Sequence, residues 1–382
     1  VRPINREEEA SLRHCFPWTV YYLQNLEYLP QAVICRGQLR SAPDQAYETV
    51  RDNVKAQFGD RFLVVFQEGM QEKPFFALVP NPDAKKTKTK VTRPGWALGL
   101  FLATLMTTTL VGSILAGVTA AELQATPILV WQGLPYALAL LTILGGHELG
   151  HYFAARYYGL AATLPYFIPV PLFLGTFGAF IQMRSPIPHR KALFDVGLAG
   201  PLVGFVLTLP LLWWGLAHSV PVEMPSPDAA SLLNFEAFNP STSLLILLLS
   251  KLAIGSAFTA ANALHLHPVA VAGCIGLVVT ALNLMPVGQL DGGHIVHAMV
   301  GQRTGAVVGQ VARILMLLLA VVMQREFLWW AILLFFIPAV DEPALNDVTE
   351  LDNRRDLLGL LAIAVLLLIV IPAPTLVQAW FQ

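Results

Sequence analysis

Hydrophobic residues in this chain gather in long runs, and short polar or Pro/Gly-rich segments separate one run from the next. A helix needs about 20 apolar residues to cross the hydrocarbon region of a bilayer. Several runs meet this requirement, and a shorter one, 327–340, carries a Trp pair at its edge, which is typical of a membrane interface. The pattern predicts an all-α polytopic membrane bundle of about six or seven transmembrane helices. The predicted spans are 96–118, 131–158, 192–217, 268–286, 305–323 and 357–376.

The N-terminal part of the chain, residues 1–83, is mixed in composition and predicts a small soluble α+β domain. Alternating patterns predict three strands, and an amphipathic pattern predicts a helix, in a βαββ order after a leading helical segment. A lysine-rich linker should join this domain to the membrane part, whose core we expect at about 131–300. The predicted strands are 31–35, 61–67 and 74–79, the helix is 44–58, the linker is 84–95, and the membrane part is 96–382.

Basic residues predict the orientation of the bundle. Lysines and arginines precede the first and third spans, whereas the loops 119–130 and 218–242 contain none. Because positive charge stays on the cytoplasmic side, we expect the N-terminal domain to be cytoplasmic, or stromal in a plastid. If the run 243–258 crossed the membrane, it would reverse the span that follows, and Lys251 interrupts it. We therefore expect an interfacial or re-entrant helix on the outer side, although the sequence does not decide whether this run spans.

Composition narrows the class of protein further. The chain is 55% hydrophobic and 13% charged, which is too apolar for a soluble enzyme, and its net charge of -1 argues against a nucleic-acid partner. The three cysteines lie far apart and form no disulfide framework, and we expect Cys274 to be a packing residue. The first six residues lack the apolar core of a secretory signal, so we expect insertion to rely on the internal spans.

One predicted span contains the sequence His147-Glu148-Leu149-Gly150-His151. Residues four apart share a helix face, so the two imidazoles can bind one zinc ion while Glu148 handles a proton. Placing ionisable side chains at this depth in a membrane costs several kcal/mol, so such residues are rare and usually serve a function. The alternative is an inert buried polar cluster. We predict a zinc site with His147 and His151 as ligands and Glu148 as general base and acid.

A catalytic zinc ion needs a third protein ligand and one open position for water. The span 268–286 ends in a Pro/Gly-broken turn that carries one carboxylate, Asp291, on the same side of the membrane as the zinc motif. We predict Asp291 as the third ligand of one zinc ion per chain; the alternative is a helix-capping aspartate. Asn283 is a candidate to hydrogen-bond the oxyanion or the substrate, or else a polar bridge between helices. His294 and His297 are left out of the zinc site.

The segment 164–185 is apolar, but its prolines and glycines forbid a regular helix. It predicts a membrane-embedded β-hairpin whose free edge could pair with an unwound substrate segment. Gly175, Phe177 and Gly178 are the candidate substrate-contacting residues. The alternative is a packed connecting loop.

The H-E-x-x-H sequence, followed by Asn283 to Gly293 with its N-x-x-P-x-x-x-L-D-G pattern, resembles the site-2 protease family of intramembrane zinc metalloproteases. Ala199-Gly200-Pro201 resembles the small-residue motif of that family's middle core helix. Gly175-Thr176-Phe177-Gly178 and Leu266-His267-Pro268 are similar to the chloroplast and cyanobacterial EGY-type branch. Gly37-Gln38-Leu39-Arg40 only approximates a Gly-Asn-Leu-Arg motif of that branch. The resemblance covers about 96–300 well and the N-terminal domain weakly.

The resemblance implies a polytopic protease that cleaves a transmembrane protein substrate in the lipid bilayer, within regulated proteolysis and in a photosynthetic setting. Two rival functions remain open, which are a catalytically silent, chaperone-like binding homologue and a zinc transporter. The spans contain almost no carboxylates besides Glu148 and Asp291, which argues against a transport path. The sequence identifies neither the substrate nor the oligomeric state, and it does not separate a plasma membrane from a thylakoid or envelope membrane.

Overall fold

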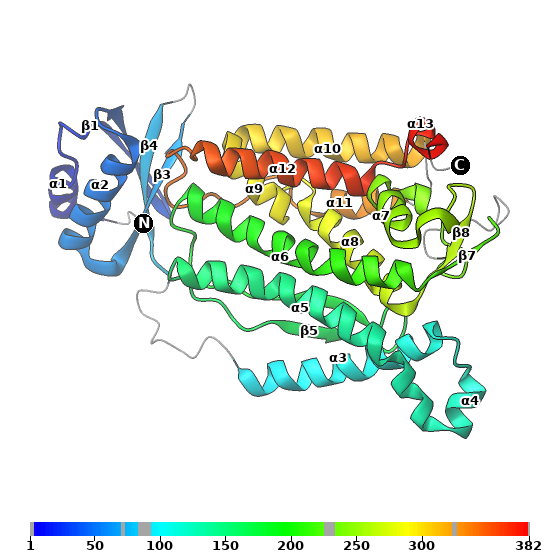
Figure 1. Cartoon of the computed structure of the whole chain (residues 1–382). Helices are drawn as coiled ribbons and strands as arrows, with labels where there is room; N and C mark the ends of the chain where they lie inside the picture. The colour runs from blue at the N-terminus through cyan, green and yellow to red at the C-terminus, as the bar shows by residue number, and fades with distance from the viewer. Residues whose placement is uncertain (1–3, 70–72, 83–92, 225–233, 323–326, 381–382) are drawn as a thin grey trace.

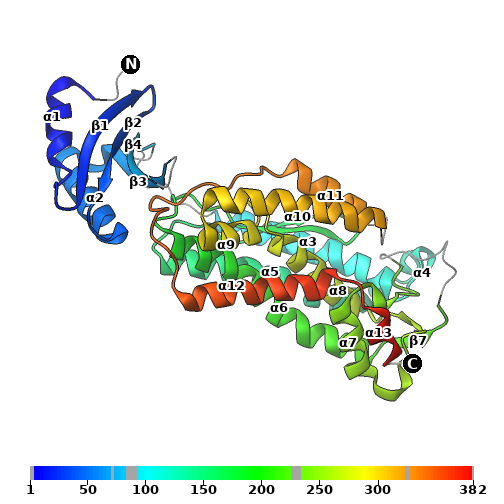
Figure 2. The ribbon, with the colours of Figure 1, turned by 90° about the horizontal axis from the view of Figure 1, so that it is seen from above.

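The structure is a computed structural model that describes residues 4–69, 73–82, 93–224, 234–322 and 327–380 (Figure 1). Most of the predicted linker 84–95 lies outside these residues. The N-terminal sheet and its helices lie at one end of an elongated helical bundle, as two perpendicular views agree (Figures 1 and 2). The opposite end carries α4 (Ala120–Ala125), β7 (Val220–Val222) and β8 (Ala263–His265).

The N-terminal part of the chain forms a four-stranded antiparallel sheet with two helices. The strand order is β1-β2-β4-β3, so β1 and β3 are the two edges. Alternate residues of β3 are buried, as expected for a strand with one face on a hydrophobic core. The elements are α1 (Arg6–His14), β1 (Tyr21–Leu29), β2 (Ala32–Leu39), α2 (Pro43–Phe58), the 3₁₀ turn η1 (Gly59–Arg61), β3 (Phe62–Glu68) and β4 (Pro74–Pro80).

The three predicted strands and the helix are confirmed, but the βαββ order was wrong because it omitted β1. This strand carries polar residues at Gln24, Asn25 and Glu27, and its pairing with β2 shifts between Leu23 and Asn25. Such a bulge inserts an extra residue and breaks the period-two alternation by which a strand is recognised. The sequence pattern of β1 was therefore hidden by its own irregularity.

Within the described residues, four helices are long and apolar enough to cross a membrane: α3 (Pro94–Leu115), α5 (Leu134–Tyr157, extended by the 3₁₀ helix η3, Pro127–Gly133), α6 (Arg190–Ala217) and α10 (Gln302–Val322). The helix α8 (Pro268–Leu284) is apolar but has 17 residues, and α7 (Leu244–Ile254) has 11. Eleven residues reach about 16 Å, too short for a bilayer of about 30 Å, which agrees with the non-spanning helix expected at 243–258. The remaining helices are α9 (Asp291–Val300), α11 (Phe327–Phe336), α12 (Asn353–Val370) and α13 (Thr375–Ala379), with 3₁₀ turns η5 (Pro240–Thr242) and η6 (Gly255–Ala257).

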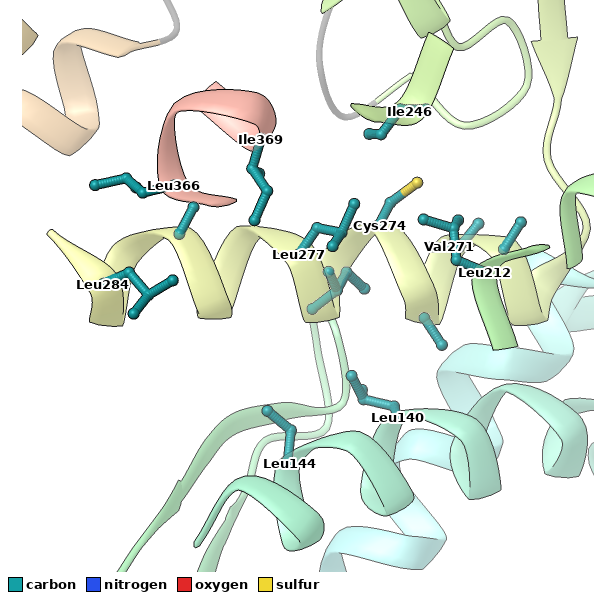
Figure 3. Packing of buried hydrophobic residues seen from close by; sticks show 14 of the residues in the cluster. Leu140, Leu144, Leu212, Ile246, Val271, Cys274, Leu277, Leu284, Leu366 and Ile369 are labelled. Carbon is teal, nitrogen blue, oxygen red and sulfur yellow. The ribbon is translucent and has the colours of Figure 1, made fainter. Parts of the chain in front are cut away.

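The core of the bundle is centred on α8, which packs against α5 and α6. Figure 3 shows α8 with Leu140 and Leu144 of α5 on one side and Leu366 and Ile369 of α12 on the other. Cys274 is 5% exposed within this cluster, which confirms it as a packing residue. The C-terminal end of α8, where the chain breaks before α9, is therefore packed within the core of the bundle.

The segment after α5 forms a β-hairpin, β5 (Tyr166–Pro169) paired antiparallel with β6 (Thr176–Phe180). The hairpin lies beside α3 and close to α5. Thr107 of α3 donates a hydrogen bond from its hydroxyl to the backbone oxygen of Gly175, at 2.7 Å. The predicted hairpin is therefore present, and its depth in a membrane stays a prediction.

Candidate metal centre and active site

The two histidines of the H-E-x-x-H sequence lie one turn apart on α5, and both side chains are buried. Their Nε2 atoms are 3.1 Å apart. Asp291 is the first residue of α9, and its Oδ2 atom lies 3.4 Å from Nε2 of His147 and 3.3 Å from Nε2 of His151. Two segments that are about 140 residues apart in sequence thus bring three donor atoms to one point.

The separation of these atoms fits a zinc ion. Tetrahedral ligands bound at about 2.0–2.1 Å lie about 3.4 Å from one another. The observed separations of 3.1 to 3.4 Å match this value, and two imidazoles with one carboxylate are a donor set that zinc prefers. Three protein ligands leave a fourth position open for water or substrate. The capping alternative for Asp291 is not supported, because the N-cap of α9 is Leu290 and Asp291 is the first residue inside the helix.

The orientation of each imidazole has a local cause. Nδ1 of His151 lies 2.8 Å from the backbone oxygen of Val196 on α6. A carbonyl oxygen only accepts, so Nδ1 donates and Nε2 keeps its lone pair for a metal. Asn283, near the end of α8, has its amide nitrogen 3.1 Å from Nε2 of His147. Among the described residues, Nδ1 of His147 has no hydrogen-bond partner.

Glycines on α6 create the space for these imidazoles. A Cβ atom on Gly200 would lie 2.0 Å from Nε2 of His151, and one on Gly204 would lie 3.2 Å from Nδ1 of His147. On α5, a Cβ atom on Gly150 would lie 2.5 Å from the backbone oxygen of Ala199. The Ala199-Gly200-Pro201 sequence therefore allows α6 to approach α5 closely enough to enclose the imidazoles of His147 and His151.

Glu148 lies next to the ligands on α5 and is partly buried. It lies close enough to His147, His151 and Asp291 to interact with them electrostatically, and its carboxylate accepts a hydrogen bond from the backbone of Ile181. Ile181 directly follows β6. The end of the hairpin and the glutamate are thus neighbours, as a substrate strand paired to β6 would require.

The three candidate residues of the hairpin differ in their surroundings. Gly175 has φ of +83° and lies against α3, where a Cβ atom would be 2.5 Å from the backbone of Thr108. Gly178 has φ of +113° with open space around it, and Phe177 is 77% exposed. Gly175 therefore has a packing role of its own, whereas Phe177 and Gly178 are accessible.

Sequence reasoning missed two features of the centre. It did not identify Val196 or Gly204, because a backbone oxygen and an isolated glycine carry no signal of their own. It left His294 and His297 out of the zinc site, which agrees with the described donor group of His147, His151 and Asp291, but it did not identify their contacts with Asp341 at 2.8 and 2.7 Å. The two histidines lie three residues apart, and they follow Asp291 within two helical turns, which is the one signal the sequence offers.

Comparison with known proteins agrees with this centre. Residues 135–323 match the family model described as Peptidase family M50, a range that includes both histidines and Asp291. Residues 10–87 match the model described as EGY3 middle domain. The chain carries a domain of peptidase family M50. This is the site-2 protease family that the motifs resemble, and the similarity to EGY proteins supports its EGY-type branch.

Three relatives are each named as a probable chloroplastic zinc metalloprotease. EGY2 of Arabidopsis thaliana is 30% identical over 369 residues, which cover 94% of this chain and 63% of the relative. EGY1 of the same plant is 35% identical over 249 residues, covering 65% and 43%. EGY3 of Oryza sativa subsp. indica is 25% identical over 379 residues, covering 95% and 64%. This M50 chain spans less than two thirds of the length of these relatives, and no solved structure matches it.

Proposed function

We propose that this chain is an intramembrane zinc metalloendopeptidase, which hydrolyses a peptide bond in or near a transmembrane segment of a substrate protein. The observation that carries the proposal is the convergence of His147, His151 and Asp291 to 3.1–3.4 Å beside Glu148. The names of the relatives as zinc metalloproteases support the same activity. The apolar helices around the centre favour a substrate that resides in a membrane.

The protein groups divide the reaction between them. A zinc ion held by the three ligands would polarise the scissile carbonyl and acidify a bound water. Glu148 takes the proton from the attacking water and later gives it to the leaving amine, so the proton balance closes within one turnover. The amide of Asn283 donates a hydrogen bond to the carbonyl oxygen as negative charge develops on it, an interaction that strengthens in the transition state.

Among the described residues β6 pairs with β5 alone, and the substrate strand pairs with the other edge of β6. A peptide bond inside a helix is shielded from water, and unwinding it in lipid leaves backbone groups without partners. A strand edge supplies these partners by β-addition. The contact between Ile181 and Glu148 supports this register, and the exposed Phe177 offers an apolar contact for a substrate side chain.

The protein is a multi-pass membrane protein whose N-terminal domain faces the cytoplasm or the stroma. The charge asymmetry of the loops supports this orientation, and the chloroplastic names of the relatives favour a plastid or photosynthetic membrane. Two further crossings, α8 and α12, complete the six proposed spans. Regulated intramembrane proteolysis is the process in which such a protease acts.

The decisive experiment measures zinc content and cleavage of a reporter transmembrane protein, in detergent, for wild type and Glu148→Gln. We expect about one zinc ion per chain in both proteins and cleavage by wild type alone, because the substitution removes the proton acceptor but no ligand. Zinc in both proteins with no cleavage of any reporter would favour a binding role. Glu148-dependent zinc flux across sealed vesicles would favour a transporter, and a wild type without zinc would refute the site.

A further inference from the structure

A short segment between α11 and α12 joins the N-terminal sheet to the rest of the molecule. The backbone N–H of Phe66 donates to the oxygen of Leu345 at 2.6 Å, and Asp347 donates from its N–H to the oxygen of Phe66 at 2.9 Å. Asn346 forms a parallel bridge with Phe66. Because Phe66 lies on the edge strand β3, residues 345–347 pair with the edge of the N-terminal sheet through one isolated parallel bridge, and we call these three residues the shared strand.

The same segment is also bound to the bundle. Leu345 donates from its backbone N–H to the oxygen of Ile187 at 2.9 Å, and Asn346 donates to the oxygen of Pro188 at 3.0 Å. These residues lead directly into α6. The side chains of Leu345 and Val348 pack against the hydrophobic core of the N-terminal domain. The segment is therefore shared between the domain and the bundle.

Two aspartates beside this shared strand hold one histidine of α9. Oδ2 of Asp341 lies 2.7 Å from Nδ1 of His297, and Oδ1 of Asp347 lies 2.9 Å from its Nε2. The three side chains are 2–7% exposed, so these are buried contacts. His294 shares the same oxygen of Asp341 at 2.8 Å. An imidazole held through both nitrogens by carboxylates is fixed in position and in orientation.

Arginine contacts fix the same end of α9. Arg190, the first residue of α6, donates to the backbone oxygens of His297 and Ala298 at 3.3 and 3.0 Å. A Cβ atom on Gly301 would lie 3.6 Å from the Arg190 guanidinium and 3.7 Å from the Glu68 carboxylate, so both charges face the end of α9. The C-terminal end of α9 is thus anchored by Arg190 of α6 and by Asp347 of the shared strand together with Asp341.

The opposite end of α9 carries the metal ligand. Asp291 begins this helix of 10 residues, and His297 lies six residues further along, about 9 Å away along the axis. A short helix transmits a displacement of one end to the other. We propose that His297 is a positioning residue that sets Asp291 relative to His147 and His151. The shared strand with Asp341 and Asp347 thereby couples the N-terminal domain to the metal centre. This inference rests on the proposed function, because it takes Asp291 as a zinc ligand.

The test measures metal binding by the full-length chain in detergent. Zinc dissociation constants are obtained by chelator competition, and the cobalt-substituted protein gives an absorption spectrum that reports the ligand geometry. Groups that orient ligands directly change metal affinity by about 10–100-fold. His297 acts through the helix, so we expect His297→Gln to weaken zinc binding by about tenfold and to alter the cobalt spectrum. His265→Gln, an exposed histidine on β8 at the far end of the bundle, is the matched control and should change neither.

Two milder variants separate positioning from folding. Asp347→Asn keeps the shape of the side chain but removes its charge, and Leu345→Ala weakens the contact with the N-terminal core without touching His297. Both should weaken zinc binding in the same direction, by about threefold or more. If His297→Gln does not fold, these two variants decide the question. Wild-type affinity and an unchanged cobalt spectrum in folded variants would overturn this inference alone. A wild type that binds no metal would overturn the proposed function and this inference together.

Discussion

The substitution Gly200→Ala tests the geometry of the metal centre with a single methyl group. A Cβ atom at this position would lie 2.0 Å from Nε2, 2.4 Å from Cδ2 and 2.5 Å from Cε1 of His151. Nonbonded heavy atoms of this kind are stable at about 3.5–4.0 Å, so the imidazole would have to retreat by about 1.5 Å. Ligand distances at a metal tolerate changes of only about 0.2 Å. The displaced imidazole therefore no longer reaches the position that it shares with His147 and Asp291.

We expect Gly200→Ala to weaken zinc binding by at least about 100-fold, which exceeds the usual effect of changing a group behind a ligand. If α6 moves away instead of the imidazole, the overpacked interface costs about 1–3 kcal/mol of stability. In that case the backbone oxygen of Val196 also withdraws from Nδ1 of His151, since Val196 and Gly200 lie on the same helix. Both routes disturb the same ligand.

Two glycine substitutions calibrate the result. Gly204→Ala would place Cβ 3.2 Å from Nδ1 of His147, a contact that a shift of a few tenths of an ångström relieves, so its effect should be intermediate. Gly99→Ala lies on α3 with no atom within 4 Å and should leave zinc binding unchanged. Zinc dissociation constants and thermal unfolding of the detergent-solubilised proteins provide the measurement. A Gly200→Ala protein that binds zinc as tightly as the Gly99→Ala protein would refute the proposed packing of α5 on α6.

Four further outcomes follow from the same structure. Glu148→Gln should retain zinc and lose about 10²–10⁴-fold in cleavage rate, and a residual rate near that of wild type would exclude it as the proton carrier. Asp291→Asn should weaken zinc binding more than Asn283→Ala does, whereas Asn283→Ala should mainly lower kcat. If Asn283→Ala instead caused the larger loss of zinc affinity, Asn283 and not Asp291 would be the ligand. Phe177→Ala should raise KM for the reporter with little change in zinc content, and unchanged kinetics would separate the hairpin from the substrate. Burial lowers the pKa of His297, but hydrogen bonds to Asp341 and Asp347 outweigh this effect and raise it to about 9. The stability it contributes is complete below 6.5, the ordinary pKa, and is lost as the pH rises through 9, so the unfolding midpoint should fall over this range less steeply in His297→Gln than in wild type.

The zinc motif on α5 and the turn before α9 could be predicted from local sequence patterns. The spacing of His147 and His151 depends only on helical periodicity, and the break before Asp291 depends only on Pro and Gly in an apolar run. Both kinds of signal lie within a few residues, so they could be interpreted without knowledge of the fold. The pairing of the two segments needed one more argument, namely that both lie at the same side of the membrane. The contacts of 3.3–3.4 Å between Asp291 and the histidines agree with that pairing.

The surroundings of the ligands depend on contacts that no local pattern encodes. Val196 binds His151 through a backbone oxygen, so any residue at this position would serve and the sequence gives no sign of it. The sequence indicated Gly200 only through the resemblance to a family motif. The physical reason for a glycine there is that a methyl group would collide with the imidazole of His151, and this collision exists only once α6 lies against α5.

The carboxylates around His297 are the extreme case. Asp341 and Asp347 lie 44 and 50 residues after His297, in an irregular segment. They reach His297 only when the neighbouring backbone of residues 345–347 is hydrogen-bonded to β3 of the N-terminal sheet. A buried histidine between two carboxylates is costly unless all three groups are paired, because each unpaired charge would lose its hydration without compensation. An arrangement of this kind at the boundary between the N-terminal sheet and the helix of Asp291 ties the stability of that boundary to the geometry of the metal centre.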